Sequence, residues 1–435
     1  MTDATGGPRP SRTAGADLVL LGVEAGLVGA AVLVGLVLNR ARVPIHADAA
    51  PLFATWLPHV GPGTPAAVAV AVAVVHSGPT WVRRLSWPRL LAAGYLAALA
   101  WTLSLALVDG WSRGLADRLT PQGEYLWDLP KVGGIRPLLA GFTGHILDFQ
   151  PGSWATHVAG HPPGAFLVFV LLDRIGLGGG GPAALLCVLV GASAPVSVAV
   201  AVRALGFPVT ARSALPFLVL FPGAVWFGAS ADGLFTGVVA AGLALLAVGG
   251  IRAGLPGGLL LGSALYLSYG LLLAGLLALA VLRFRHDART VLAGLAGFAT
   301  VVAGFTAAGF WWPTGYRLVV QRYYQGWAAD RPYGYWVWAD LAALVLCAGP
   351  VLGPALRRLV LTRHPVALLP AAALVAILAA DLSGLSKAEV ERIWLPYAIW
   401  LPVAAGWLPP DRHRVWLAAQ AATALAVNHL LLTAW

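Results

Sequence analysis

The polar residues of this sequence that could take part in chemistry lie in segments that interrupt long apolar runs. Asp48 is the only acidic residue of the segment 39–64, which follows the first apolar run. A carboxylate in a loop that also contains Pro44, His46 and Trp56 can act as a general base if it reaches the proton to be removed. The alternative is that Asp48 is a solvated loop residue or caps the following turn.

Two further segments mix acids, bases and aromatic rings. "GEYLWDLPKV" includes Glu124 and Tyr125, and "FTGHILDFQPGSW" includes His145, Asp148 and Trp154. Carboxylates bind hydroxyl groups and aromatic faces stack on sugar rings, so we expect Glu124 and Tyr125 to bind substrate. The alternative is an aromatic belt at a membrane interface with local ion pairs.

The segment "THVAGHPPGAF" places His157 and His161 four residues apart, the spacing of a metal pair on a helix. Pro162 directly follows His161 and disfavours helical geometry there, so the two rings should not share a helix face. We therefore predict no metal ligands in this segment. Both histidines are expected to be hydrogen-bonding partners for a substrate.

Two further features suggest a site for a charged group. Asp232 lies where one apolar run ends and the next begins, a position that suits either function at membrane depth or a helix N-cap. The segment 311–338 places Arg317, Arg322 and Arg331 among tyrosines and tryptophans. Guanidinium groups bind phosphate oxygens in two-point contacts, although Arg, Trp and Tyr also anchor ordinary membrane interfaces.

Four charges lie within six residues in "SGLSKAEVERIWLPY", just before a late apolar run. They are Lys387, Glu389, Glu391 and Arg392. A solvated turn would have the same composition. Arg392, however, stands beside the hydrophobic boundary, where the phosphate of a lipid would lie.

The composition shows what must position these residues. The chain has 435 residues, of which 59% are hydrophobic and 11% charged, and its mean hydropathy is +0.79. Soluble domains carry about 25% charged residues, so the solvent of this chain must be lipid. A spanning helix needs about 20 apolar residues, which predicts an all-α integral membrane protein with roughly 11–13 transmembrane helices.

The distribution of Lys and Arg predicts the orientation of the chain. Short basic turns should face the cytoplasm, with the segments 39–64, 109–181, 311–335 and 381–393 outside. We expect residues 1–15 to be a disordered cytoplasmic tail. The rest, residues 16–435, should be a single transmembrane domain in which the large extracytoplasmic loop 109–181 carries interfacial helices.

Several functional classes are excluded or disfavoured. The net charge is +10, but the basic residues are scattered between apolar runs, so we expect no nucleic-acid partner. Cys187 and Cys347 lie in apolar runs and predict neither a disulfide nor a metal site. The sequence contains no phosphate-binding Walker loop, dinucleotide fingerprint, H-E-x-x-H motif or G-x-S-x-G elbow.

Three features in this order resemble the GT-C superfamily of polytopic glycosyltransferases. They are the acid after the first span (Asp48), "HPPG" at 161–164 and "EVERIWLP" at 389–396. Members include protein O-mannosyltransferases, aminoarabinose transferases and actinobacterial mannosyl- and arabinofuranosyltransferases. The resemblance covers most of the chain as a GT-C-type helical bundle, but only these short motifs as residues.

The resemblance implies a polyprenyl-phosphate sugar as donor and transfer with inversion at the plasma membrane, in an extracytoplasmic site. The acceptor would be a cell-envelope glycan, glycolipid or protein, and Asp48 would be the general base. Ala49 follows Asp48 where protein O-mannosyltransferases have an Asp-Glu pair, which argues against protein mannosylation. Some members use a divalent cation and others need none.

The resemblance also suggests which residues bind the donor phosphate and which bind the substrates. The donor phosphate would be bound by Arg392, Arg317, Arg322 and Lys387. The substrates would be bound by His157, His161, Glu124, Tyr125, Asp232, Glu389 and Glu391.

Two other functions fit the same composition. One is transport, as an exporter or flippase of a lipid-linked saccharide, and the other is a binding role for a catalytically inactive relative. A transporter would concentrate its polar residues at the membrane midplane. Here Glu24 is the main ionisable residue deep in an apolar run and the polar residues concentrate in the outer loops, which favours an enzyme.

Overall fold

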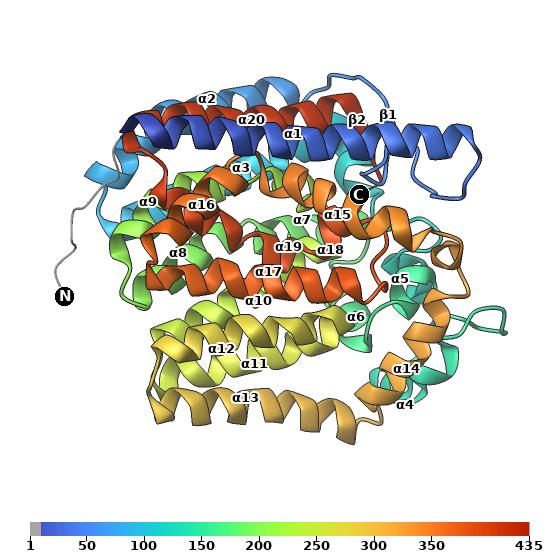
Figure 1. Cartoon of the computed structure of the whole chain (residues 1–435). Helices are drawn as coiled ribbons and strands as arrows, with labels where there is room; N and C mark the ends of the chain where they lie inside the picture. Colours follow the sequence, from blue (N-terminus) through green and yellow to red (C-terminus); the bar gives the residue numbers. More distant parts are fainter. Residues whose placement is uncertain (1–9, 435) are drawn as a thin grey trace.

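The computed structural model describes the backbone of residues 10–434 and the side chains of residues 15–434. Most helices run along one common direction, and the described strands form one two-stranded sheet (Figure 1). The predicted all-α class is therefore confirmed. Residues 1–9 of the predicted tail lie outside the described residues, and α1 begins at Pro10.

Seven helical segments of the described chain are long and apolar enough to cross a membrane, so the chain is a multi-pass membrane protein. They are formed by α1 (Pro10–Arg40), α2 (Thr64–Arg84), α3 (Trp87–Ala106), α7 and α8 together (Gly180–Gly191 and Ala194–Ala204), α10 (Ala231–Val248), α13 (Ala288–Ala307) and α17 (Leu368–Leu382).

Seven is fewer than the 11–13 spans expected, because other apolar runs form shorter, bent or less apolar helices. These are α9 (Pro208–Val219), α11 (Ile251–Leu267), α12 (Ala274–Phe284), α15 (Tyr333–Ala348), α16 (Leu352–Thr362), α19 (Leu395–Ala398) and α20 (His413–Leu430). The sharpest break is the 88° bend between α15 and α16. There Gly349 adopts a positive φ of 87° and Pro350 cannot continue the helix.

The segments predicted to face outside gather at one end of the bundle, on the right of Figure 1, which we call the loop-rich end. The segment 109–181 builds much of it from turns and short helices. Its first helical turn is a π-helical one, Ser112–Ala116. The other helices here are α4 (Ile135–Gly141), α5 (Thr156–Ala159), α6 (Pro163–Arg174), α14 (Trp312–Tyr323) and α18 (Val390–Ile393).

A two-stranded antiparallel sheet ties the first loop to the C-terminal segment. Strand β1 (Ala54–Trp56) pairs with β2 (Leu431–Thr433), so that Ala54 lies opposite Thr433. Two backbone bonds extend the pairing, from Leu57 N to Leu430 O and from His59 N to His429 O. The loop that carries Asp48 therefore ends in a fixed position.

Glycines let the peripheral helix α13 approach α11 closely. A Cβ at Gly258 would lie 1.9 Å from the carbonyl oxygen of Gly294, and a Cβ at Gly297 would lie 2.3 Å from that of Leu255. Small residues of this kind allow backbone contact between helices in lipid, where packing rather than burial drives association.

We expect Gly258→Ala to separate α11 from α13 and to destabilise the fold by roughly 1–3 kcal/mol, the usual effect of overpacking. Thermal unfolding in detergent measures it. Gly275→Ala is the matched control, because a Cβ there meets nothing within 4 Å. Equal melting temperatures for the two variants would contradict the packing argument.

Candidate functional site

The guanidinium of Arg392 is the centre of a buried ionic cluster at the loop-rich end. Its Nη1 donates to Asp232 Oδ2 at 2.6 Å, and its Nη2 donates to Glu389 Oε2 at 2.7 Å. Arg392 and Asp232 are both buried. A buried charge is tolerated only when it is paired and hydrogen-bonded, and here two carboxylates do this for one cation.

Two helices bring these groups together. Asp232 lies in the first turn of α10, where Ser230 caps the helix by accepting from the Asp232 backbone N–H. Ser230, and not Asp232, is therefore the N-cap of α10. The carboxylate of Asp232 is thus available to bind Arg392. Arg392 lies in α18, and Glu389 caps that helix in a left-handed conformation with φ 65°.

The charges shift each other's protonation in the expected directions. Burial alone would lower the pKa of Arg392, but Asp232 and Glu389 outweigh it and raise the pKa above its ordinary value. Burial alone would raise the pKa of Glu389, but Arg392 and Arg331 outweigh it and lower the pKa. The cluster is therefore ionic at neutral pH.

His157 and Glu124 extend the cluster on one side. His157 Nδ1 lies 2.8 Å from Glu124 Oε1, and its Nε2 lies 3.4 Å from Arg392 Nη2. Because a guanidinium can only donate, Nε2 must accept, and the proton of a neutral imidazole then lies on Nδ1. His157 therefore donates to Glu124.

Tyr125 and His161 form a second, more buried layer. The Tyr125 hydroxyl lies 3.0 Å from His161 Nδ1, which also lies 2.7 Å from the carbonyl oxygen of His157. Burial raises the pKa of Tyr125 and lowers that of His161 to about 4. His157 lies in α5, whereas His161 lies beyond its end. Among the described residues, no group of three or more His, Cys, Asp or Glu side chains could hold a metal ion.

Arg331 fixes the other side of the cluster and was not among the predicted site residues. Both of its terminal nitrogens lie 3.2 Å from Glu389 Oε1. It also donates to the carbonyl oxygens of Lys387 at 2.8 Å and His46 at 3.5 Å. Its position in an Arg-rich aromatic segment was visible in the sequence, but nothing there distinguished it from Arg317 and Arg322.

Glu391 binds the backbone of the first loop. Its Oε1 accepts the backbone N–H of Phe53 at 2.9 Å, and the side chain is buried. Burial raises the pKa of Glu391 to about 7. Together with Arg331, Glu391 holds the loop that carries Asp48.

Asp48 itself is exposed, and its carboxylate has no hydrogen bond or ion pair to the residues that the structure describes. Of the other predicted phosphate ligands, Arg317 is exposed and contacts Thr314, while Arg322 pairs with Asp148. Lys387 donates to the carbonyl oxygen of Arg331 at 3.0 Å. Asp48, Arg317 and Arg322 therefore lie outside the contacts of Arg392, whereas Lys387 adjoins the cluster at Arg331.

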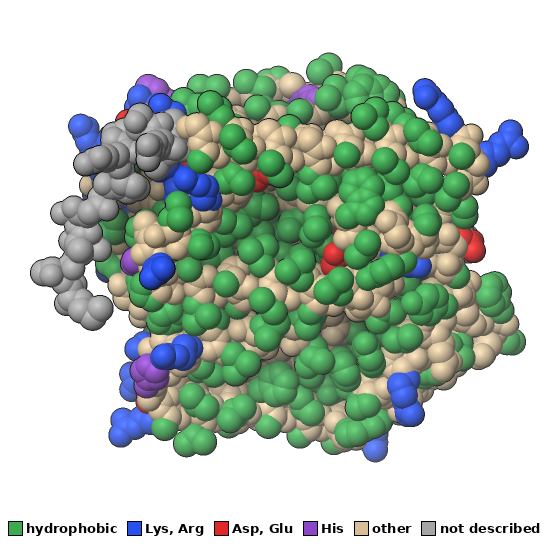
Figure 2. Space-filling model, in the orientation of Figure 1, with side chains coloured by type: hydrophobic (Ala, Val, Ile, Leu, Met, Phe, Trp, Pro, Cys, Tyr) green, Lys and Arg blue, Asp and Glu red, His purple; other side chains and the backbone are tan. Residues whose placement is uncertain are grey.

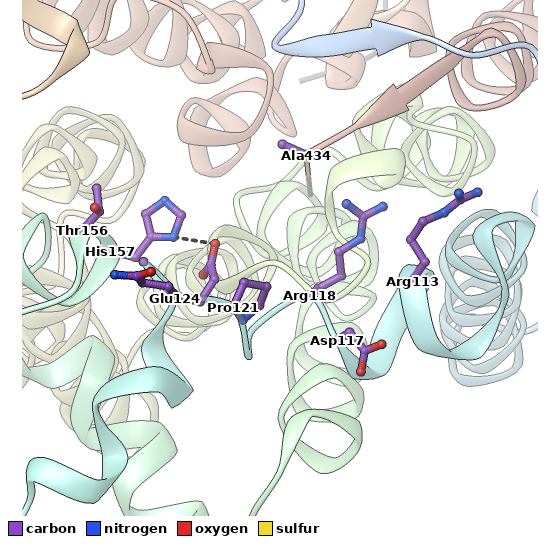
Figure 3. A pocket seen from close by; sticks show the side chains of 10 residues that line it. Arg113, Asp117, Arg118, Pro121, Glu124, Thr156, His157 and Ala434 are labelled. Atoms are coloured by element: carbon purple, nitrogen blue, oxygen red, sulfur yellow. Dashed lines mark ion pairs between the residues drawn. The ribbon is translucent and has the colours of Figure 1, made fainter.

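A cavity of about 520 Å³ adjoins the cluster (Figure 3). Glu124, His157 and Thr156 line one side, and Arg113, Asp117 and Arg118 line the other, with Ala434 across the top of the view. The cavity joins the ionic cluster to a second group of charges that the sequence did not single out as a site.

Asp109 organises the second group of charges. Its carboxylate lies 2.6 Å from Arg113 Nη2, 3.4 Å from Arg118 Nη2 and 3.3 Å from His59 Nε2. Arg118 also donates to the carbonyl oxygen of Thr433 at 2.8 Å, so the C-terminal strand is held at the rim of the cavity.

No family model, curated protein or solved structure matches this chain.

Removing the central cation should destabilise the fold strongly. We expect Arg392→Met to cost roughly 3–5 kcal/mol, because it leaves the buried Asp232 carboxylate without its ion-pair partner. Adding Asp232→Asn should recover part of this loss. Thermal unfolding of both variants measures the effect, and a stable Arg392→Met protein would show that the cluster is not a structural ion network.

The buried His161 should make stability depend on pH. Its pKa of about 4 in the fold is below the value of about 6.5 in an unfolded chain. Its contribution is therefore complete above pH 6.5 and is lost as the pH falls toward 4. We expect the melting temperature of His161→Gln to fall less over this window than that of wild type. The exposed His76 provides the control His76→Gln, and parallel curves for all three proteins would contradict this assignment.

Proposed function

We propose that this protein is a glycosyltransferase of GT-C type, which moves a sugar from a polyprenyl-phosphate donor to a hydroxyl of a cell-envelope acceptor. One observation carries the proposal. A buried cluster of carboxylates, imidazoles and guanidinium groups adjoins a cavity of about 520 Å³ at the loop-rich end of a membrane-spanning bundle. We place that end on the extracytoplasmic face of the plasma membrane.

The cluster offers the groups that sugar transfer from a phosphate requires. Carboxylates and imidazoles bind sugar hydroxyls, and a cation stabilises the negative charge that develops on the departing phosphate. Arg392 is balanced by Asp232 and Glu389, so a phosphate must displace one of these carboxylates to reach it. Arg317, Arg322 and Lys387 remain candidates for the phosphate within this proposal.

The resemblance in the sequence assigns the role of general base to Asp48. It lies in the first loop, whose backbone is held by Arg331 at His46 and by Glu391 at Phe53. An exposed carboxylate on a fixed loop can meet an acceptor that arrives from solvent.

Transport of a lipid-linked saccharide is the second candidate, and one observation favours it. The α15–α16 pair is a helix bent by 88°, and broken helices are common at the binding sites of transporters. Charged contacts also occur within the spans, between Asp17 and Arg358 at 2.6 Å and between Glu24 and the Gly353 N–H. Both contacts join α1 to α16, which favours a structural role.

The function is tested with purified protein in lipid nanodiscs, a labelled polyprenyl-phosphate sugar and a panel of envelope glycans, glycolipids and peptides. We expect a glycosylated product from this donor and none from a nucleotide sugar. Arg392→Lys keeps the charge but loses the fork that spans Asp232 and Glu389. We expect it to lower transfer at least about tenfold, the effect of roughly 1.4 kcal/mol.

Vesicles distinguish the alternatives. Movement of the lipid-linked sugar across the bilayer without any product would identify a transporter. Donor binding without product or movement would identify an inactive relative. Asp411→Asn is a control for the substitutions, because Asp411 is exposed and lies at the opposite end of α20 from β2.

A further inference from the structure

Glu124 is the carboxylate that lies between the cavity and the ionic cluster. Two acidic residues line the cavity, Glu124 and Asp117. Asp117 is more exposed than Glu124 and accepts a hydrogen bond from Ser112. The side chain of Glu124 is 12% exposed and lies beside His157 (Figure 3).

The two oxygens of Glu124 have different surroundings. Oε1 lies 2.8 Å from His157 Nδ1, whereas Oε2 is buried and has no hydrogen-bond partner among the described residues. A buried acceptor without a donor costs free energy. A hydroxyl group bound in the cavity would provide that donor.

His157 connects Glu124 to the centre of the cluster. The contact of Arg392 with His157 Nε2 keeps this nitrogen unprotonated, so the imidazole proton points from Nδ1 to Glu124. Asp232 and Glu389 in turn hold Arg392 in place. This chain of contacts fixes the position of Glu124. A carboxylate that is held in place and has one oxygen without a partner is suited to accept a proton.

We propose that Glu124, and not Asp48, is the general base for the reacting hydroxyl, which binds in the cavity; this inference rests on the proposed function. The acceptor O–H bond breaks and its proton passes to Glu124 Oε2. The acceptor oxygen forms a bond to the anomeric carbon, and the bond from that carbon to the phosphate oxygen breaks. The electron pair of that bond leaves with the phosphate.

The surroundings of Asp48 support the same choice. Asp48 is exposed and does not line the cavity. Glu124 lines it and belongs to an ordered network. In this scheme His157 acts through Glu124 and is a positioning residue.

Four variants test the assignment in the nanodisc transfer assay. Glu124→Gln keeps the side-chain shape and an oxygen that accepts from His157, but it cannot take a proton. We expect kcat to fall by about 10²–10⁴, the usual contribution of a general base, with donor KM changed less than about threefold. Glu124→Asp should recover part of the lost rate. Asp48→Asn should stay within about tenfold of wild type, and Asp411→Asn should be unchanged.

A comparison of kcat with KM separates a catalytic role from a structural one. In His157→Gln the carboxylate of Glu124 loses a donor fixed by Arg392, so kcat should fall while donor KM changes little. The melting temperatures of Glu124→Gln and Glu124→Asp should match wild type.

The outcomes are distinct. Glu124→Gln with kcat within about tenfold of wild type would overturn the inference. A large loss in Asp48→Asn alone would return the role of base to the first loop. If Glu124→Gln unfolds, the transfer rate of Glu124→Asp tests the assignment instead. A wild-type rate for Glu124→Asp would count against Glu124 as the base. Failure of the wild-type protein to transfer any sugar would overturn the proposed function itself.

Discussion

The loop-rich end is organised around the need to neutralise one buried guanidinium. Arg392 lies between Asp232 and Glu389, and Glu389 in turn contacts Arg331. These contacts join α10, α18 and the segment before α15. His157 adds α5 to the same network. Loss of Arg392 would leave the buried Asp232 without its ion-pair partner away from water, so these elements and the cavity beside them are constrained together.

The sequence predicted the class of the protein and the grouping of its polar residues better than their individual contacts. Asp232, Glu389, Arg392, His157 and Glu124 were all expected at one site and are joined by direct contacts. The position of each residue beside an apolar run, together with the resemblance in the sequence, led to this expectation. The roles within the site depend on pairs far apart in the chain, for which a single sequence gives no signal.

Local patterns were least informative where residue types repeat. Arg317, Arg322 and Arg331 have similar neighbours in the sequence, but only Arg331 turns inward to Glu389. The described chain has seven helical segments long and apolar enough to cross a membrane, or eight if the bent α15–α16 pair is one span, against the 11–13 expected. Hydropathy measures how apolar a run is, whereas residues such as Gly349 and Pro350 decide where a helix breaks.

The sheet between β1 and β2 has a consequence for how the protein is assembled. Strand β1 follows the first membrane span, whereas β2 follows α20, so the partners are separated by almost the whole described chain. Contacts of such long sequence separation form late in folding. The end of the first loop therefore has no β2 partner until every intervening helix has been inserted. A partly inserted chain would lack both this strand pair and the rim that Ala434 adds to the cavity.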